Sequence, residues 1–345
     1  MKKEYKEKIM HLQSKPYPLI SVTMPAYNAE ATIASSLESI IAQDYPNIEI
    51  IVVNDASKDA TEHAARRVLE GCGRPFSVIT HKENRGVSAS RNTGINAMKG
   101  EFVWFIDADD MAENGVISTL YSRIEKHKCD LSFCGYKNRF ENGRPDVLVP
   151  VKLDDTKIYN GEDLLWLRVF HKIEPCGLLL RRNFLFETGL RFHEGCTAGE
   201  DVEFQLKALC RAGQVAFASD CFYIYIHHAG MGSIRENSSK EKQIRRYRDN
   251  THAHLRTALY LSEHAPSEKI KELAENYLMP EALIRRLTLC VKTGDRAEFH
   301  AILSDSVIQK TLSSSKNYFF RKPEIYLKAF ALLHFPDIYY RLRSE

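Results

Sequence analysis

The sequence predicts an α/β protein with a mostly parallel central sheet, helices on both faces of that sheet, and a helical region towards the C-terminus. Two observations support this fold class. In the first 130 residues, apolar β-rich runs alternate with segments whose apolar residues recur at helical spacing. After about Asn237, glycine and proline become sparse, and helical spacing dominates to the end of the chain.

Four strands are expected in the first part of the chain, with three helices between them. The strands are LISVTMPAY at 19–27, NIEIIVVND at 47–55, FSVITHK at 76–82 and FVWFIDAD at 102–109. The helices are AEATIASSLESIIAQD at 29–44, KDATEHAARRVLE at 58–70, which Ser57 can cap, and GVSASRNTGINAMKG at 86–100. Because this alternation builds a parallel sheet, Asp55 and Asp107 are expected at one rim, where such sheets bind ligands.

The rest of the chain is expected to be more mixed. Strands are expected at 129–140, 145–153 and 214–228, and helices at 161–172 and 199–213. We expect an N-terminal extension at 1–17, a main domain at 18–236 with halves 18–128 and 129–236, and a separate helical appendage at 237–345.

The composition excludes several classes of protein. A net charge of +3 is too close to balance to indicate nucleic-acid binding. The eight cysteines form no C-x-x-C pair, so free thiols in a reducing compartment are expected rather than a zinc site. The first residues lack the apolar centre of a signal peptide, and no apolar run approaches the about 18 residues of a spanning helix. A cytoplasmic location is therefore expected.

Clustered acids follow the fourth strand and raise the question of what they hold. Asp107, Asp109 and Asp110 would repel one another unless a cation or polar ligand lies among them. Carboxylates on a loop suit Mg²⁺ or Mn²⁺, which bridge protein acids and a diphosphate. A solvated turn or a helix cap would explain the same residues, and capping would equally explain Asp55.

Several motifs, taken together, narrow the alternatives. MPAYNAEATIASSLESIIAQDYPNIEIIVVNDASKDAT and ENRGVSASRNTGINAMKGEFVWFIDADD occur in order over roughly 20–110. This combination closely resembles inverting glycosyltransferases of family 2, which have the GT-A fold. The resemblance continues more weakly through LRFHEGCTAGEDVEF to about residue 235.

The resemblance implies a nucleotide-binding role for the half at 18–128. Pro25, Ala26 and Tyr27 would line the nucleotide pocket, and Asp55 would bind the uracil or its ribose. The loop from Asn84 to Arg91 would lie beneath the nucleotide, although Arg91 could equally be a structural ion-pair partner. In the motif Asp107-Ala108-Asp109, the first acid would contact ribose and the second would coordinate the metal, with Asp110 in support.

The resemblance also implies an acceptor-binding role for the half at 129–236. Asp201 of GED at 199–201 would be the general base, and Glu200 would orient loop contacts or the acceptor. Acids at a helix start also complement its dipole, and the identical tripeptide at 161–163 is expected to cap a helix. His227 or His228 could complete the metal site, and Ser233 and Arg235 could close over the diphosphate.

The expected reaction is a single displacement with Mn²⁺ or Mg²⁺ as cofactor. A nucleotide-sugar, expected to be a UDP-sugar, would donate to a hydroxyl of a saccharide or lipid-linked saccharide in cell-surface polysaccharide synthesis, such as capsule or exopolysaccharide. A sugar nucleotidyltransferase would need a glycine-rich basic loop where this chain has PAYNAEAT, and an NAD enzyme would need G-x-G-x-x-G. A nucleotide-sugar-binding protein without catalytic activity is the non-enzyme alternative.

The last 30 residues hold eight aromatic residues and six Lys or Arg against three acids. Basic aromatic segments of this kind can lie on anionic membranes, here on the inner face of the cytoplasmic membrane. Aromatic residues at helical spacing also pack into cores or form homodimer contacts. Packing against the chain itself is the favoured interpretation.

Overall fold

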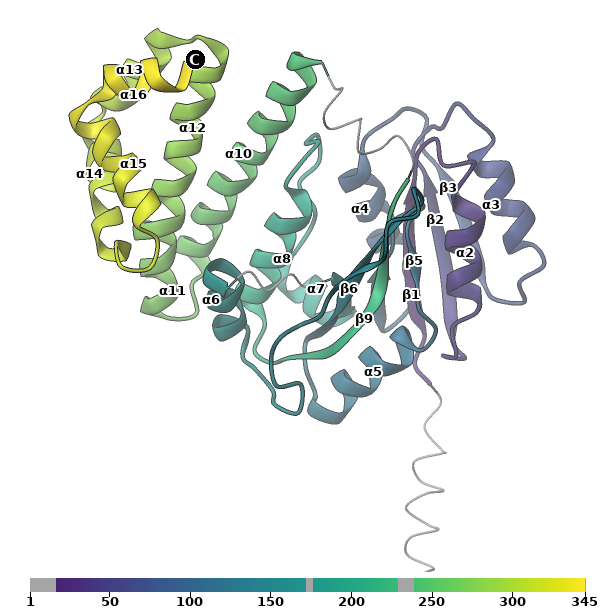
Figure 1. Ribbon diagram of the computed structural model, residues 1–345. Helices are drawn as coiled ribbons and strands as arrows, with labels where there is room; N and C mark the ends of the chain where they lie inside the picture. Colours follow the sequence, from purple (N-terminus) through teal and green to yellow (C-terminus); the bar gives the residue numbers. More distant parts are fainter. Residues whose placement is uncertain (1–16, 172–175, 229–238, 345) are drawn as a thin grey trace, which may run out of the picture.

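The computed structural model describes residues 17–171, 176–228 and 239–344, and a curled nine-stranded sheet runs through its centre (Figure 1). Almost all of the expected extension at 1–17 lies outside the described residues. The strand order is β3-β2-β1-β4-β8-β6-β9-β5, with β7 paired to β6. The strands are β1 (Ile20–Ala26), β2 (Ile48–Asn54), β3 (Phe76–Thr80), β4 (Phe102–Phe105), β5 (Met111–Ala112), β6 (Leu131–Phe140), β7 (Val147–Val149), β8 (Cys176–Arg181) and β9 (Val215–His227).

The first four strands are parallel neighbours, as the strand–helix alternation predicted. β1 pairs with both β2 and β4, and β2 pairs with β3. Their carboxyl ends therefore meet at one rim. Asp55 directly follows β2, and Asp107 follows β4 with one residue between them. The expected common rim is therefore present.

The sheet continues through strands that the sequence did not fully reveal. β8 is antiparallel to β4 and β6, whereas β6 and β9 are parallel. β8 was not predicted, because its six residues carry no alternation or turn signal. The segment after Asp110 forms the short strand β5, which pairs antiparallel with β9.

Helices cover both faces of the sheet. They are α2 (Ile33–Ile41), α3 (Thr61–Leu69), α4 (Val87–Ala97), α5 (Val116–His127), α6 (Gly161–His171), α7 (Arg182–Thr188) and α8 (Glu200–Arg211). Successive residues of β2 belong to different cores: Ile50 and Val52 pack with α2 and α3, whereas Ile51 and Val53 pack in the core that includes α4 and α8. A strand buried on both faces needs a continuous apolar run, which NIEIIVVND supplies.

The expected cap of α3 is wrong. Its N-cap residue is Ala60, which makes no side-chain cap hydrogen bond. The Ser57 hydroxyl instead accepts a hydrogen bond from the Asn28 backbone N–H at 3.0 Å, and the Asn28 side chain accepts one from Lys58 N–H at 2.9 Å. These bonds join the loops that follow β1 and β2, so Ser57 shapes the rim rather than the helix.

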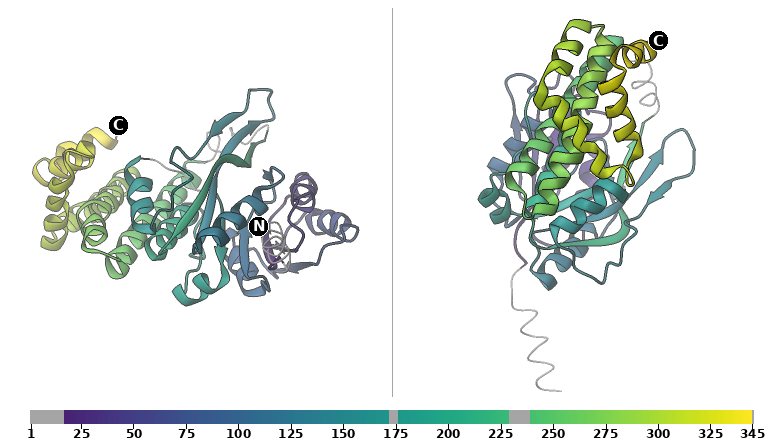
Figure 2. Two further views of the ribbon diagram at one scale, coloured as in Figure 1. Left: turned by 90° about the horizontal axis from the view of Figure 1, so that it is seen from below. Right: turned by 90° about the vertical axis from the view of Figure 1, so that its left-hand side faces the viewer.

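All described elements after Lys240 are helical (Figure 2). They are α10 (Lys240–His264), α11 (Glu268–Leu273), the π-helical turn η1 (Ala274–Leu278), α12 (Met279–Thr293), α13 (Arg296–Ser304), α14 (Ser306–Ser314), the 3₁₀ turn η2 (Ser315–Tyr318), α15 (Pro323–His334) and α16 (Pro336–Ser344). Their buried residues form one continuous apolar cluster with those of β6, α6 and α8. The helical region therefore shares its core with the sheet and is not detached from it.

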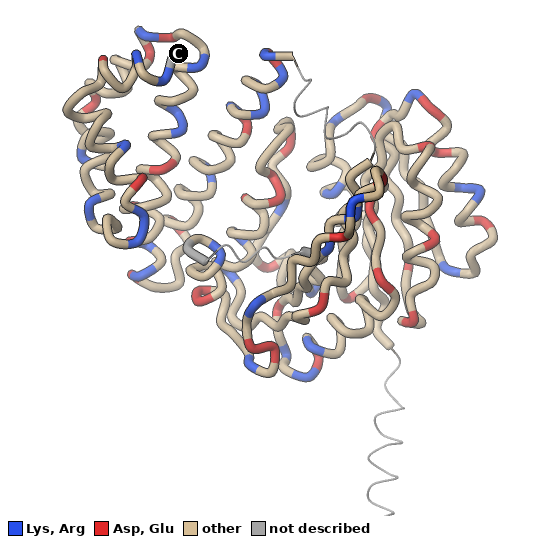
Figure 3. The backbone as a smooth tube through the Cα atoms, in the orientation of Figure 1, with Lys and Arg blue, Asp and Glu red and all other residues tan. Residues whose placement is uncertain are grey.

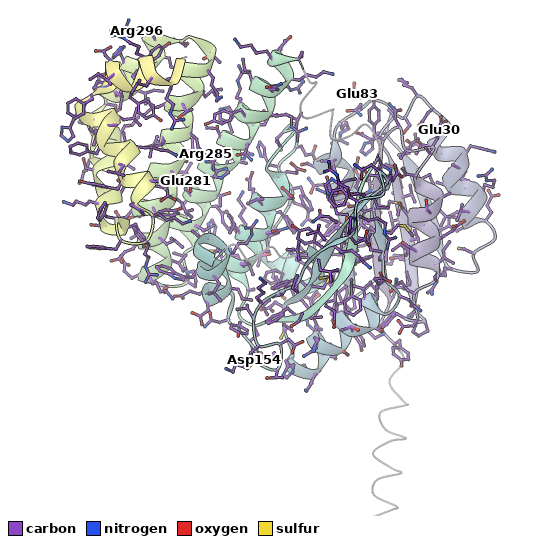
Figure 4. The ribbon with its side chains drawn as sticks, in the orientation of Figure 1. Glu30, Glu83, Asp154, Glu281, Arg285 and Arg296 are labelled. Atoms are coloured by element: carbon purple, nitrogen blue, oxygen red, sulfur yellow. The ribbon has the colours of Figure 1, made fainter. Side chains whose placement is uncertain are left out.

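Polar contacts add to this packing between the helical region and the sheet. Glu203 of α8 is buried and accepts bonds from Arg256 of α10 at 2.7 Å and from Lys207 at 2.6 Å. Arg285 of α12 pairs with Glu281 at 3.0 Å and reaches Asn250 of α10 at 3.5 Å (Figure 4). The helices thus form a connected series from α8 through α10 to α12.

Two expectations from the composition concern the whole chain. The seven cysteines whose side chains are described are free thiols. None of the helices within the described ranges is both long enough and apolar enough to cross a bilayer.

Gly94 tests how closely α4 packs on β1. A Cβ atom at Gly94 would lie 2.0 Å from Cγ2 of Thr23, a residue with no exposed surface. Gly94→Ala should therefore lower the free energy of unfolding by about 1–3 kcal/mol, measured by urea denaturation. Gly71→Ala is the matched control, because a Cβ there meets nothing within 4 Å, and its effect should stay within about 0.5 kcal/mol. Equal effects of the two substitutions would contradict the close packing.

Arg256 tests the tie between α8 and α10. Burial raises the pKa of Glu203, but the hydrogen bonds from Arg256 and Lys207 outweigh burial and hold that pKa below its ordinary value of 4.5. Arg256→Met leaves a buried carboxylate short of a partner and should cost about 3 kcal/mol of unfolding free energy at pH 7.

This cost should depend on pH in a defined direction. The lowered pKa means that the ion pair stabilises the fold fully above pH 4.5 and stops doing so as the pH falls through the folded-state value. The difference between wild type and Arg256→Met should therefore shrink below pH 4.5. Arg66→Met, which breaks an exposed helical pair with Glu62, should cost only about 0.5 kcal/mol at pH 7. A pH-independent difference for Arg256→Met would argue against the ion pair.

Candidate active site

A cavity of about 320 Å³ opens at the carboxyl ends of β1, β2 and β4. Thirteen residues line it: Pro25, Ala26, Tyr27, Asn28, Ala29, Ala31, Thr32, Asp55, Val87, Ser90, Asp107, Ala108 and Asp109. Seven of these were predicted site residues, from three separate segments. We call this space the first cavity.

Asp55 lies on the wall of the first cavity and is held by the chain itself. Its Oδ1 accepts hydrogen bonds from Arg85 N–H at 2.9 Å and contacts His81 Nδ1 at 2.7 Å, and its Oδ2 accepts one from Gly86 N–H at 2.7 Å. The predicted residue Asn84 does not line the cavity but donates to the Asp55 carbonyl at 3.4 Å. The carboxylate therefore fixes the loop before α4 to the end of β2.

His81 is a site residue that the sequence reasoning missed. Its side chain is buried, and its Nε2 lies 2.9 Å from the hydroxyl of Thr93 on α4. The ring thus connects Asp55 to α4. A histidine at the end of a strand gave no signal by itself, because the chain has 13 histidines.

A second cavity of about 140 Å³ adjoins the first and shares Asp107 with it. Its lining residues are Arg91, Phe105, Asp107, Gly177, Leu178, Phe192, Asp201, Phe204, Gln205 and Tyr223. The acids predicted at 55, 107, 109 and 201 therefore line two cavities with a common wall. Asp201, the residue most distant in sequence from the others, is on the same side of the fold as they are.

Arg91 lies buried between the two cavities. Its guanidinium contacts Asp107 Oδ1 at 2.8 Å and Glu200 Oε1 at 3.6 Å, and it lies 5.2 Å from the centre of the Phe192 ring. Burial alone would lower the pKa of Arg91, but the charges of Asp107 and Glu200 raise it above its ordinary value. Arg91 therefore pairs with one acid at the shared wall of the cavities and with one acid of α8.

Asp201 stands in the first turn of α8, which begins after Gly199. That glycine has φ = 86°, and a Cβ there would approach Ala253 and Asn250 of α10. The preceding loop is also fixed to α10, because Asp249 accepts hydrogen bonds from Thr197 N–H at 2.8 Å and from its hydroxyl at 2.6 Å. The helical region thus sets the position at which Asp201 enters the second cavity.

Glu200 and Asp201 are neighbours with different surroundings. Glu200 faces Arg91 and lines neither cavity, and burial followed by the charge of Asp201 raises its pKa. The Asp201 side chain is exposed, and its Oδ1 accepts a hydrogen bond from Val202 N–H at 2.8 Å. Of the two neighbouring acids, Asp201 is thus the exposed one that lines a cavity, whereas Glu200 contacts Arg91.

Asp110 is the most buried of the clustered acids. It accepts hydrogen bonds from the Tyr223 hydroxyl at 2.6 Å and from Ile226 N–H at 3.1 Å. Burial, together with the charge of Asp107, raises the pKa of Asp110 to about 8. It therefore fixes β9 to the acidic loop, in the supporting role expected, and Tyr223 is a second residue that the sequence reasoning missed.

Asp109 is the acid best suited to a divalent cation. It is half-buried on the wall of the first cavity, and no ion pair to its carboxylate occurs among the described residues. Burial and the charge of Asp107 raise the pKa of Asp109 above its ordinary value. The described ranges contain no cluster of three metal-binding side chains. One carboxylate together with a diphosphate nevertheless suffices for Mg²⁺ or Mn²⁺, so Asp109 fits that role.

The two histidines after β9 differ in position. His227 is bonded to Asn138 at 2.9 Å and stacks on Phe140, with ring centres 4.6 Å apart. It is His228 whose Nε2 contacts the Asp109 carbonyl at 3.1 Å. Of the two histidines, His228 therefore contacts the acidic loop, and His227 does not line either cavity. Ser233 and Arg235 lie outside the described residues.

Comparison with known proteins places this geometry in a family. Residues 21–187 match the family described as Glycosyl transferase family 2. The chain is 34% identical to the glycosyltransferase GlyA of Streptococcus pneumoniae over 60% of its length, and 30% identical to EpsJ of Bacillus subtilis, an uncharacterized glycosyltransferase, also over 60%. The chain spans 30% of GlyA and 61% of EpsJ.

A solved structure supports the fold. The crystal structure of Staphylococcus aureus TarS 1-349 in complex with UDP-GlcNAc matches with a TM-score of 0.66 and 21% sequence identity, over 94% of this chain and 90% of that one. The two chains therefore share the GT-A-like fold, including the C-terminal helices. The region at 21–187, which builds the rim around the first cavity, is therefore similar to glycosyl transferase family 2.

Proposed function

We propose that this protein is an inverting glycosyltransferase that moves a sugar from a UDP-sugar to a hydroxyl of a saccharide or lipid-linked saccharide in cell-surface polysaccharide synthesis. The observation that carries the proposal is the pair of adjoining cavities that share Asp107. One has the size and lining of a nucleotide site, and the other presents an exposed carboxylate at Asp201. The bacterial relatives named as glycosyltransferases support the reaction class.

The first cavity is proposed to hold the nucleotide. Backbone from Pro25 to Tyr27 and the half-exposed Tyr27 ring offer contacts for a base, and Asp55 and Asp107 offer acceptors for N–H and hydroxyl groups. A bound Mn²⁺ or Mg²⁺, held by Asp109, would neutralise charge on the departing diphosphate.

The second cavity is proposed to hold the acceptor. A sugar hydroxyl is a poor nucleophile, and Asp201 would remove its proton as the oxygen attacks the anomeric carbon. The bond between that carbon and the diphosphate oxygen breaks in the same step, so the configuration inverts and no covalent enzyme intermediate forms. Glu200 faces Arg91 and lines neither cavity, so Asp201 is the acid of this neighbouring pair that would meet the acceptor.

Asp201→Asn tests the general base. It should lower the rate of UDP release from UDP-sugars with acceptor present by about 10²–10⁴-fold. Stabilisation of the chain by UDP in thermal unfolding should be unchanged, because Asp201 lines the other cavity.

The chain supplies a matched control for this substitution. Asp163 ends an identical Gly-Glu-Asp at the start of α6 and lies near Lys269 at 3.6 Å. Asp163→Asn should leave UDP release unchanged. If both variants retain full activity, Asp201 is not the base; if the wild-type chain binds UDP but releases none from any donor, the protein is a binder.

Asp109→Asn tests the metal site. In wild type, UDP with Mn²⁺ should raise the melting temperature more than UDP alone, since a ligand at 100 times its Kd adds about 2.7 kcal/mol of stability. The substitution should remove the Mn²⁺-dependent increment and keep the increment due to UDP alone. His227→Gln is the control and should keep both, because its ring is engaged with Asn138. Loss of the Mn²⁺ increment in His227→Gln alone would reverse the two assignments.

A further inference from the structure

An exposed row of apolar side chains runs along the outermost helices. We call it the aromatic strip and define it as Phe319, Phe320, Tyr326, Leu327, Phe330 and Phe335. Consecutive ring centres are 5.4 Å (Phe320 to Phe319), 5.2 Å (Phe319 to Tyr326), 6.2 Å (Tyr326 to Phe330) and 6.3 Å (Phe330 to Phe335) apart. The strip is therefore continuous from η2 through α15 to the start of α16.

The strip is not needed to hold the helix in place. The opposite face of α15 packs into the core through Ile325, Ala329 and Leu332, which are at most 8% exposed. On the outer face, Leu327 is 57% exposed and Phe330 is 41% exposed, and Phe320 in the preceding turn is 97% exposed. Exposed apolar side chains that cluster in this way mark interaction sites in soluble domains.

Basic residues outnumber acids in the segment that carries the strip. Between residues 316 and 344 the chain carries Lys316, Arg321, Lys322, Lys328, Arg341 and Arg343 but only two acids, Glu324 and Asp337. Asp337 is already paired with Arg296 of α13 at 2.6 Å. The segment that carries the strip is therefore net positive, and Lys and Arg positions recur along these helices in Figure 3.

We propose that the aromatic strip docks the protein onto an anionic lipid surface. Aromatic rings flanked by Lys and Arg match the boundary between acyl chains and negatively charged headgroups. A second copy of this chain fits less well, because a two-fold contact would place this net-positive surface against the same net-positive surface. The described helices include none that could span a bilayer, so the contact lies in the plane of the surface.

The strip lies at the opposite end of the molecule from α2 and α3 (Figures 1 and 2). It shares no residue with either cavity. Docking therefore leaves the proposed donor and acceptor sites unaltered, and it does not depend on the proposed transfer reaction. A binding assay without nucleotide-sugar keeps failure of one proposal distinguishable from failure of the other.

Vesicle sedimentation with the full chain tests the proposal. The chain should bind phosphatidylcholine vesicles that contain 30% phosphatidylglycerol at least tenfold more strongly than vesicles of phosphatidylcholine alone. Binding to the anionic vesicles should weaken as the salt concentration is raised, because salt screens the attraction between charges. Phe320→Ser/Leu327→Ser and Lys316→Glu/Lys328→Glu should each reduce binding to the anionic vesicles about tenfold or more.

Two control variants carry the same chemical changes elsewhere. Leu259→Ser alters an exposed leucine of α10, and Arg67→Glu/Lys126→Glu reverses two exposed charges on α3 and α5. Both should bind as wild type, and circular dichroism should show that every variant is folded. Wild-type binding by Phe320→Ser/Leu327→Ser would overturn the proposal. So would a concentration-dependent dimer that this variant abolishes, because the strip would then be a self-association surface.

Discussion

The buried guanidinium of Arg91 is the interaction on which the site depends. Asp107, Asp109, Asp110, Glu200 and Asp201 come together from β4 and α8, and without a cation among them their mutual repulsion would push the two elements apart. Arg91 contacts Asp107 and Glu200, one acid from each element. Its burial would cost several kcal/mol if it were unpaired, so the two halves of the site form together or not at all.

A second constraint comes from the helical region. α10 holds Asp249 against the loop that precedes α8, and Arg256 against Glu203 within α8. The position of Asp201 is therefore determined from both sides, by Arg91 through Glu200 and by α10 through the loop. The helical region belongs to the proposed acceptor site as much as to the overall packing.

The sequence predicted the parallel part of the sheet because buried strands and helices there have distinct apolar periods. It also predicted that Asp55, Asp107 and Asp109 would meet, since the carboxyl ends of parallel strands share a rim. β8 escaped prediction because a short apolar run inserted antiparallel has no local signature. Other features depend on how the loops lie against one another in the folded chain. These are the hydrogen-bond partners of Asp55, the loop contact that Ser57 makes in place of a helix cap, and the contact of His228 with the acidic loop. One-residue differences of that kind are set by tertiary packing and not by local sequence.

The tail shows a different limit of sequence reasoning. Apolar residues on two sides of α15 add up to a helix that is apolar nearly all round, and such a helix is ordinarily buried. Here one side packs through Ile325, Ala329 and Leu332, as the favoured interpretation required, and the other side remains exposed in the described chain. Composition alone could not distinguish the packed side of α15 from its exposed side, because both sides carry apolar residues at helical spacing. What favours an anionic surface for the exposed side is charge, since the segment at 316–344 carries six Lys or Arg and only two acids.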